Sequence, residues 1–415
     1  MTPTPRAAVA LAAVSLSLLV LPPAVPLLVA LALVGATVVD AWWAHRQPIV
    51  ERLAPRTLVR GVPAPFTLHA VDDAASMRLR QPLSPDLELE PASEADRELV
   101  ARIVARRRGR HRLPEAAVRR RGPLGLAAWT HRAEEPAEIL VYPDLPGARR
   151  LASSVRAGRF RDEGLRRRGP LGLGTEFESV REYSPDDDIR QVNWRATARL
   201  GRPMSNQYRV ERDRDVVCLL DCGRLMSAPF ADKTRLDVAL DAAVAVAAVA
   251  DVLGDRCGAI AFAGEILVSL PPRRAGARDV VHALFDLEPV RVDSNYELAF
   301  QHVRGVKRAF VLVLTDLLEE SAARPLVDAI PVASARHAVT VAGAADLDLD
   351  ALVREPPVDP VDVYRTAAAL GVLDARATVA AKLRRAGADV VEAPQDALAA
   401  ACVRAYLRAK WTARF

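Results

Sequence analysis

The first forty residues constrain this chain more than any other feature, because 33 consecutive residues from Ala7 to Val39 carry no charge. One straight helix of that length would run about 50 Å, which exceeds the roughly 30 Å hydrocarbon core of a membrane. Three prolines between residues 22 and 26 interrupt the run. We therefore predict a transmembrane helical hairpin over residues 1–45, with one helix near 5–21 and a second near 24–43.

The flanks of the hairpin predict its orientation. A hairpin returns the chain to the side on which it started, and Trp42 and Trp43 would lie at the membrane interface. The basic residues downstream and the four cysteines, which form no CxxC pair, favour the cytoplasm. A cleaved signal peptide is the alternative, but a second apolar run directly after the first argues against it. We expect a two-pass protein of the cell membrane with residues 46–415 in the cytoplasm.

The chain beyond the hairpin has the composition of a folded protein. Hydrophobic residues make up 51% of the chain and charged residues 26%, which excludes a disordered or collagen-like protein. The net charge of +5 permits an acidic partner such as a lipid surface or nucleic acid, but requires neither. The seven histidines include no HExxH pattern, so a catalytic zinc site is not expected.

Residues 46–145 have the pattern of a small β-sandwich. Short runs in which apolar and polar residues alternate are separated by proline or glycine. The strands are expected near residues 78–80, 87–90, 97–105, 116–121, 126–131 and 138–141.

Nine arginines and one glutamate lie between residues 100 and 121. We interpret them as the solvated face of strands beside a membrane, and attraction to anionic lipid headgroups is the sharper alternative. Specific binding of nucleic acid is not expected, because no aromatic residues are interleaved with the arginines. The octapeptide Arg119 to Leu126 recurs at residues 166–173, and its Gly-Pro and Leu-Gly pairs predict a basic turn before an apolar segment.

From residue 211 onward, continuous apolar runs alternate with helical segments, as is typical of an α/β sheet with helices on both sides. Asp221 follows the first expected strand and Asp316 a later one, and function collects beyond the carboxyl ends of such strands. The strands are expected over 216–220, 257–263, 266–270, 309–315, 337–342 and 388–393. The helices are expected over 235–253, 277–286, 296–304, 322–333, 374–386 and 395–409.

The segment 174–199 is unusually dense in charge. Residues 184–188 have the pattern of a turn and helix start, with acids at the positive end of the helix. Arg190, Trp194 and Ala198 would then share one helix face. We expect Trp194 to be buried, with Arg190 and the acidic cluster nearer the surface. The segment is interpreted as a structural clamp or as a surface that docks a partner.

The segment contains Glu176-Phe177, Arg181-Glu182-Tyr183, Pro185-Asp186-Asp187-Asp188 and Asn193-Trp194 in close succession. This pattern resembles the signature of the bacterial "domain of unknown function 58" family. The resemblance implies a von Willebrand factor A-like domain, which agrees with the α/β pattern. The expected plan is a transmembrane hairpin (1–45), a β-rich domain (46–145), a linker with the signature segment (146–210) and an α/β von Willebrand factor A-like, Rossmann-like domain (211–415). The signature positions that would bind a partner or hold the structure are Glu176, Arg181, Tyr183, Asp186, Asp187, Asp188, Arg190, Trp194 and Arg199.

The resemblance also implies a position for a metal site. Domains of this type often hold Mg²⁺ with an Asp and two Ser after the first strand, a hydroxyl from a second loop, and an Asp after a later strand. Asp221, Ser294 and Asp316 match three of these positions, while glycine and leucine stand where the two serines would be. Arg224 could replace the charge of the cation. We expect a degenerate site without a cofactor, and Mg²⁺ is the alternative.

Genes that resemble this family commonly accompany those of MoxR-type AAA+ ATPases. The resemblance therefore implies a membrane-anchored, non-enzymatic adaptor that works with such an ATPase in the assembly or maturation of other complexes. The chain has no phosphate loop of its own, which is consistent with an adaptor rather than a motor. The alternatives are a metal-dependent hydrolase that uses Asp221 and Asp316, and a protein that binds anionic lipid or nucleic acid.

Overall fold

The structure is a computed structural model of the full chain. It describes residues 2–17, 19, 21–71, 76–160, 176–184, 189–209, 213–230, 233–316 and 320–412. The chain divides into two compact units, Met1–Tyr142 and Pro143–Phe415, each of which is described by itself. The acidic cluster Asp186 to Asp188 and the second copy of the octapeptide lie outside the described residues.

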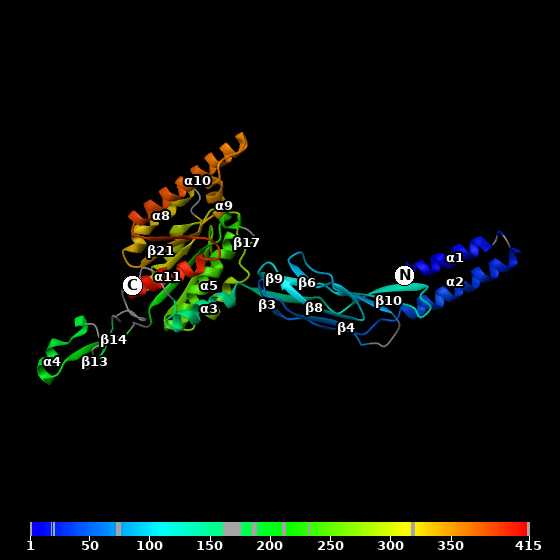
Figure 1. The fold of residues 1–415 in the computed structure, drawn as a ribbon, viewed down its shortest axis with the longest axis horizontal. Helices are drawn as coiled ribbons and strands as arrows, with labels where there is room; N and C mark the ends of the chain where they lie inside the picture. Colours follow the sequence, from blue (N-terminus) through cyan, green and yellow to red (C-terminus); the bar gives the residue numbers. More distant parts are fainter. Residues whose placement is uncertain are drawn as a thin grey trace. The chain divides into compact units, whose positions relative to one another are not determined.

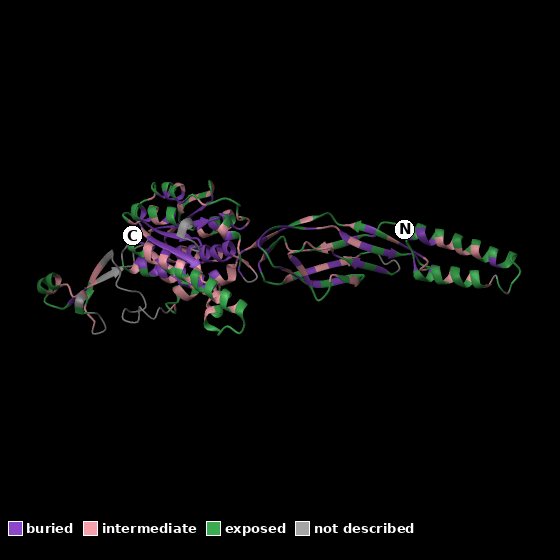
Figure 2. Cartoon of the chain, turned by 90° about the horizontal axis from the view of Figure 1, so that it is seen from above, coloured by how far each residue is buried: buried purple, intermediate pink, exposed green. Residues whose placement is uncertain are grey.

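The first unit begins with two helices that lie side by side, α1 (Pro5–Ser17) and α2 (Ala24–Ala44) (Figure 1). By length and composition, α2 is the one helix of the described residues that could cross a membrane, and α1 is apolar but shorter. Most of their apolar side chains are exposed, as the green colour in Figure 2 shows. A membrane-spanning α2 would bury these side chains in lipid instead of water.

The rest of the first unit consists of three antiparallel or mixed sheets around one apolar core. In β8 (Glu98–Ala105) every second residue is buried, because successive side chains of a strand point to opposite faces. One sheet has the order β1 (Thr2–Pro3), β11 (Ala127–Ala133), β10 (Ala116–Arg121), β5 (Met77–Arg80) and β7 (Glu94–Asp96). The others are β2 (Val50–Leu53), β4 (Ala64–Ala70), β8 and β6 (Leu87–Glu90), and β3 (Thr57–Val59), β12 (Ala137–Tyr142) and β9 (Gly109–Leu113).

The second unit is built on a six-stranded sheet in which only the edge pair β18·β19 is antiparallel. Its central strand β15 (Asp215–Asp221) is buried along its whole length, as expected for a strand covered on both faces. The strand order is β19 (Ile266–Arg273), β18 (Arg256–Phe262), β15, β20 (Ala309–Leu314), β21 (Ala338–Ala344) and β22 (Asp389–Ala393).

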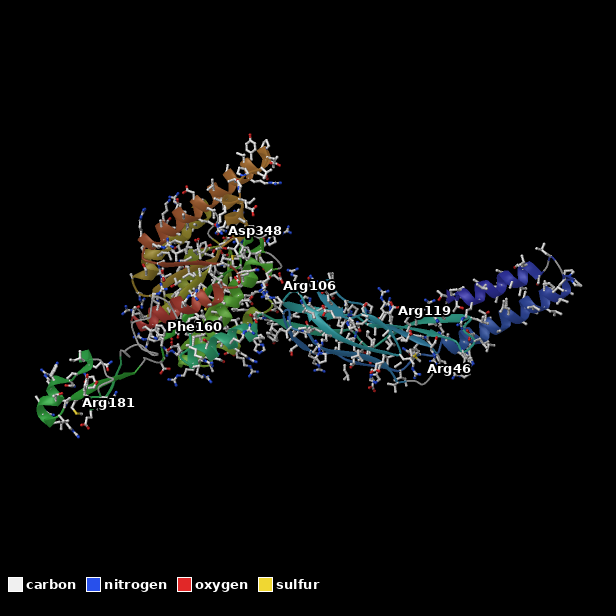
Figure 3. The ribbon with its side chains drawn as sticks, viewed as in Figure 1. Arg46, Arg106, Arg119, Phe160, Arg181 and Asp348 are labelled. Atoms are coloured by element: carbon white, nitrogen blue, oxygen red, sulfur yellow. The ribbon has the colours of Figure 1, made fainter. Side chains whose placement is uncertain are left out.

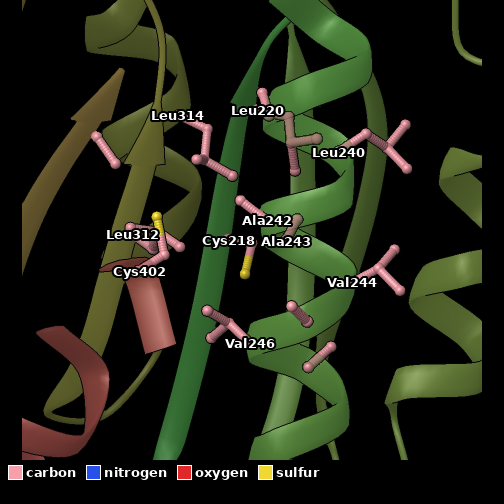
Figure 4. Packing of buried hydrophobic residues seen from close by; sticks show 14 of the residues in the cluster. Cys218, Leu220, Leu240, Ala242, Ala243, Val244, Val246, Leu312, Leu314 and Cys402 are labelled. Atoms are coloured by element: carbon pink, nitrogen blue, oxygen red, sulfur yellow. The ribbon is translucent and has the colours of Figure 1, made fainter. Parts of the chain in front are cut away.

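Helices cover both faces of this sheet, and each face has its own apolar core. On one face α5 packs directly on β15, where Leu240 and Val246 lie near Cys218 and Leu220 (Figure 4). The helices of this face are α3 (Leu145–Arg156), α5 (Arg235–Leu253), α6 (Ala277–Leu284) and α11 (Leu398–Trp411). The other face carries α7 (Tyr296–Val303), α8 (Glu320–Ser334) and α10 (Pro360–Arg385), and α9 (Leu347–Arg354) contacts α10.

Two regions of the second unit differ from the sequence-based expectations. Residues 146–156, which we assigned to a linker, form most of α3 and pack on α5. The helix expected over 374–386 is the second half of α10, which begins at Pro360 with Asp359 as its N-cap. The Asp359 carboxylate accepts the Asp362 N–H at 2.8 Å, so this cap fixes the early start.

The signature segment folds as a small antiparallel hairpin of β13 (Glu176–Glu182) and β14 (Met204–Arg209). A 3₁₀ turn (Ile189–Gln191) and the short helix α4 (Trp194–Leu200) lie between the strands. The expectation that Arg190, Trp194 and Ala198 share one helix face is wrong. Asn193 caps α4 by accepting the Ala196 N–H at 3.0 Å, so the helix begins after Arg190.

Candidate functional site

The carboxyl ends of β15 and β20 bring the predicted acids together. The two strands are neighbours and parallel, so Asp221 at the end of β15 and Asp316 beyond β20 lie at the same edge of the sheet. Ser294 reaches this edge from the loop before α7. The three residues expected in a metal site are therefore adjacent, and each has protein partners.

The carboxylate of Asp221 is surrounded by hydrogen-bond donors. Its Oδ2 accepts the hydroxyls of Tyr296 at 2.8 Å and Thr315 at 2.6 Å, and these two hydroxyls lie 2.8 Å from each other. Its Oδ1 accepts the Ser294 hydroxyl and the Gly223 N–H, the latter at 2.8 Å. Asp221 is only 2% exposed, and these four donors replace the water that burial removes.

Gly223 explains why one expected serine is missing from the site. A Cβ atom built on Gly223 would lie 2.1 Å from Ser294 Oγ and 3.0 Å from the Val292 carbonyl oxygen. No side chain fits there while Ser294 donates to Asp221. The space that a first-loop side chain would occupy at this position is filled by the second-loop hydroxyl of Ser294.

Asp316 is held by two buried arginines. Arg235 Nε lies 2.9 Å from Asp316 Oδ2, and Arg376 Nη2 donates to Asp316 Oδ1 at 3.2 Å. Arg235 is the first residue of α5 and Arg376 lies in α10, so the guanidinium groups come from helices on opposite faces of the sheet. Arg235 also contacts Asp346, at 3.3 Å. This edge of the sheet thus holds fixed positive charge of its own.

Arg224 lies beside Asp221, and the two residues line one hollow at the sheet edge. Its Nε donates to Asp293 in an ion pair whose side chains are both exposed. Arg235 and Arg376 supply buried positive charge at Asp316. Neither could be assigned to the site from its position in the sequence, because each joins it only through the packing of a helix on the sheet.

Burial shifts the pKa values of two ionisable groups of the site, Tyr296 and Arg235. Burial, and next the charge of Asp221, raise the pKa of the Tyr296 phenol well above its usual value of 10.0. Tyr296 therefore stays protonated and remains a hydrogen-bond donor to Asp221 near neutral pH. Burial lowers the pKa of Arg235, whereas Asp316 raises it, and an arginine keeps its charge under such conditions.

A hollow of 280 Å³ opens beside Asp221, and its lining includes Leu225, Ser294 and Pro325. Within the described ranges, no group of three or more His, Cys, Asp and Glu side chains is placed to hold a metal ion. The donor set around Asp221 and Asp316 does not fit a divalent cation. Each carboxylate oxygen already has a protein donor or guanidinium, which a cation would have to displace.

A larger groove of 640 Å³ lies between α7 and α8. Its lining is apolar at Phe300, Val303 and Val332, with arginine and acidic side chains around them. The sequence analysis did not identify this groove, because it is formed by two helices whose facing surfaces are defined only by packing.

The signature hairpin carries exposed apolar residues, contrary to the expectation for its tryptophan. Trp194 is 70% exposed, Ile189 70% and Leu200 53%. The expectation that Trp194 is buried is wrong, because α4 is only seven residues long and has no buried residue of its own. We call the exposed side of α4 that carries Trp194 the signature face.

The other signature residues have different positions in the hairpin. Arg181 (Figure 3) is exposed on β13, Tyr183 is half-buried after it, and Arg199 is exposed in the last turn of α4. Glu176 opens β13 opposite Arg209. Arg190 lies in the 3₁₀ turn.

A protein-family model matches a part of the chain that contains most of the signature hairpin and the acidic edge of the sheet. Residues 179–358 match the family model described as "Protein of unknown function DUF58". An uncharacterised protein of Mycobacterium bovis is 27% identical over 245 residues, which cover 54% of this chain and 75% of that protein. Uncharacterised proteins from two strains of Mycobacterium tuberculosis match with the same identity and coverage. The matched region includes Trp194, Asp221 and Asp316, but not Arg376.

Proposed function

We propose that this chain is a membrane-anchored adaptor that binds protein partners through the signature face and performs no catalysis itself. The exposure of Trp194 is the observation that carries this proposal. Tryptophan and arginine dominate the binding energy of protein interfaces, and Trp194 is followed directly by the exposed Arg195. A large aromatic side chain that is exposed to water on a helix indicates a binding surface rather than a core position.

The partner we propose is a MoxR-type AAA+ ATPase, and the process is assembly or maturation of other complexes. The resemblance of the signature segment to the domain of unknown function 58 family supports this partner. The absence of a phosphate loop from the sequence fits a chain that depends on a separate motor.

We further infer that the second unit is a von Willebrand factor A-like domain whose ion site works without metal. The buried parallel strands with helices on both faces support the fold assignment. The two guanidinium groups on Asp316 and the four donors on Asp221 support a metal-free site. A hydrolase would need one of these carboxylates as a general base, and both are engaged as acceptors of structural hydrogen bonds or ion pairs.

The membrane anchor in this proposal is a two-pass hairpin of α1 and α2, with residues 46–415 in the cytoplasm. The length and apolar surface of α2 support one span. A second span by α1 is supported by its apolar sequence and by its packing along α2.

Affinity purification tests the adaptor role. The detergent-solubilised full chain is captured from its own cells, and the proteins that co-purify are identified by mass spectrometry. We compare the native chain with Trp194→Ala and with Tyr364→Ala, a matched control that removes a 78% exposed aromatic side chain from α10. Trp194→Ala should reduce recovery of an AAA+ ATPase about 30-fold, the effect of losing an interface contact worth about 2 kcal/mol.

The control and the melting temperatures make the result specific. Both substitutions remove exposed side chains, so neither should lower the melting temperature by more than about 2 °C. Equal ATPase recovery with all three chains would refute docking through the signature face. Loss of ATPase recovery with Tyr364→Ala alone would show that the docking surface lies on α10.

A further inference from the structure

The octapeptide turn Arg119 to Leu126, which we call the basic turn, is bound directly to the end of the apolar helix α2. The buried carboxylate of Asp40 in α2 accepts the N–H groups of Leu124, Leu126 and Ala127, each at 2.7 Å. Three backbone donors are a strong site for a buried carboxylate. Asp40 therefore fixes the basic turn at a constant height along α2.

The start of α1 holds the same turn from the other side. Thr4 Oγ1 donates to the Gly125 carbonyl at 2.6 Å, and Thr4 N donates to the Leu126 carbonyl at 3.0 Å. The side chain of Arg6 lies over Gly125, with Nη1 at 3.2 Å from the position that a Cβ would take. Both apolar helices are thus fastened to one turn.

The aromatic residues at the end of α2 indicate where this position lies relative to a bilayer. The guanidinium of Arg46 lies 4.8 Å above the ring of Trp42 and 4.2 Å above the ring of Trp43. Adjacent tryptophans with a following arginine are typical of the headgroup level of a bilayer. Asp40 is two to three residues from this pair, or about 3–5 Å along the helix, so the basic turn lies at the same level.

The side chains of the basic turn suit that level. Leu124 is 55% exposed, although its own backbone N–H is bound by the buried Asp40 carboxylate. Arg119 and Arg121 of the same turn are exposed, whereas Asp40, whose carboxylate binds the turn, is buried. An exposed apolar side chain in a turn with exposed arginines matches a surface whose interior is apolar and whose rim is anionic.

The structure also divides the arginine run of the sequence into separate groups. Arg119 and Arg46 lie at the end of the first unit that carries the helices, whereas Arg106 lies at the opposite end (Figure 3). Arg106 pairs with Glu88 at 2.8 Å, and Arg110 contacts Glu138 at 3.6 Å. Only part of the run is therefore placed to meet a membrane.

We propose that the basic turn is a binding site for acidic phospholipids. Leu124 enters the acyl boundary, and Arg46 and Arg121 contact the phosphate groups. The inference rests on the proposed membrane anchor and adds a lipid specificity to it. An arginine near an anionic bilayer surface contributes about fivefold in affinity, so removal of both should reduce acidic-lipid retention by about 25-fold.

Fluorescence quenching tests the position of the turn. All four native cysteines, at 218, 222, 257 and 402, are buried, so a bimane label will report on an introduced surface cysteine. Leu124→Cys, Leu31→Cys in α2 and Arg106→Cys are labelled in the full chain and reconstituted in vesicles that contain brominated lipid. We expect strong quenching at 31 and 124 and none at 106.

The three labels test the lipid site and the membrane anchor separately. Quenching at 31 without quenching at 124 would overturn the lipid site and leave the anchor intact. No quenching at 31 would refute the membrane anchor itself, and the lipid site with it.

A second measurement tests the lipid class. The full chain is reconstituted with equal phosphatidylcholine and phosphatidylglycerol, extracted in mild detergent, and the retained lipids are quantified by mass spectrometry. Arg46→Gln with Arg121→Gln should lose phosphatidylglycerol preference about 25-fold, whereas the matched pair Arg106→Gln with Arg110→Gln should keep it. Equal retention by both double variants would overturn the proposal.

Discussion

Arg235 Nε lies 2.9 Å from Asp316 Oδ2, and both side chains are almost completely buried. Because Arg376 contacts the other oxygen of the same carboxylate, one buried negative charge faces two buried positive charges. Asp346, at 3.3 Å from Arg235, supplies the second negative charge. The carboxyl edge of the sheet is therefore a balanced ion network that joins α5, α10 and the start of α9.

This network predicts that Asp316 is essential for the stability of the second unit. Asp316→Ala should lower the free energy of unfolding by about 3–5 kcal/mol, because it removes the carboxylate that both buried guanidinium groups contact. Urea denaturation of the detergent-solubilised chain, followed by circular dichroism, measures the change. Asp293→Ala is the matched control, since Asp293 also pairs with an arginine but its side chain is 80% exposed.

The control should change stability by less than about 1 kcal/mol, as is usual for surface ion pairs. If Asp316→Ala and Asp293→Ala have the same small effect, the buried network does not hold the sheet edge together.

The same donors predict that the site binds Mg²⁺ weakly or not at all. A cation would have to displace the hydroxyl donors of Asp221 and the guanidinium groups of Asp316, and the first loop offers no serine in return. Isothermal calorimetry of the full chain with Mg²⁺ should give no dissociation constant at or below roughly 10 µM. Tighter binding that disappears in Ser294→Ala would show that these residues form a metal site.

Much of the second unit could be predicted because its signals are local. Helix α5 has the predicted bounds Arg235–Leu253, where Thr234 forms a capping box with Asp237 and Gly254 ends the helix with positive φ. The apolar runs of β15 and β20 identify strands that are covered on both faces. Most of α10 escaped prediction because its first half carries exposed apolar residues such as Tyr364, so no burial pattern marks it.

The candidate site was predictable only in part, because its partners come from distant elements. Asp221, Ser294 and Asp316 could be placed at one edge from strand order and resemblance. Their hydrogen-bond and ion-pair partners, above all Arg376, lie one or more helices away in the sequence. Arg224 does line the hollow beside Asp221, but its ion pair with Asp293 could not be predicted from the sequence.

The close contact between Asp40 of α2 and the basic turn predicts that Gly122 tolerates no side chain. A Cβ on Gly122 would lie 2.2 Å from Asp40 Oδ1 and 2.5 Å from the Asp40 carbonyl oxygen. Gly122→Ala should therefore cost about 1–3 kcal/mol of unfolding free energy in the first unit, as overpacking does. Proteolysis of the solubilised chain over a urea series, with fragments identified by mass spectrometry, assigns the loss to that unit.

Gly305→Ala is the control, because a Cβ at Gly305 would meet nothing within 4 Å. It should shift stability by less than about 0.5 kcal/mol. Equal protease resistance of both variants would contradict the close approach of Asp40 to the turn.

His337 predicts how the stability of the second unit depends on pH. Its Nδ1 accepts the Ala309 N–H at 3.2 Å at the start of β20, which requires a neutral ring. Burial, and next the charge of Arg336, lower the pKa of His337 below its usual 6.5. Above pH 6.5 the ring is neutral in both states, so its contribution to stability is complete. Below 6.5 the unfolded chain gains a proton that the folded chain does not.

Stability should therefore fall as the pH decreases from about 6.5, by at most about 1.4 kcal/mol per pH unit for this group. The loss ends when the pH passes the lowered pKa of the folded state. His337→Asn keeps an acceptor near the position of Nδ1 but does not titrate, so its melting temperature should decline less than that of the native chain between pH 7.5 and 5.5. Scanning calorimetry of both chains across this range measures the difference. Parallel pH profiles would show that His337 is not the group that makes the second unit sensitive to acid.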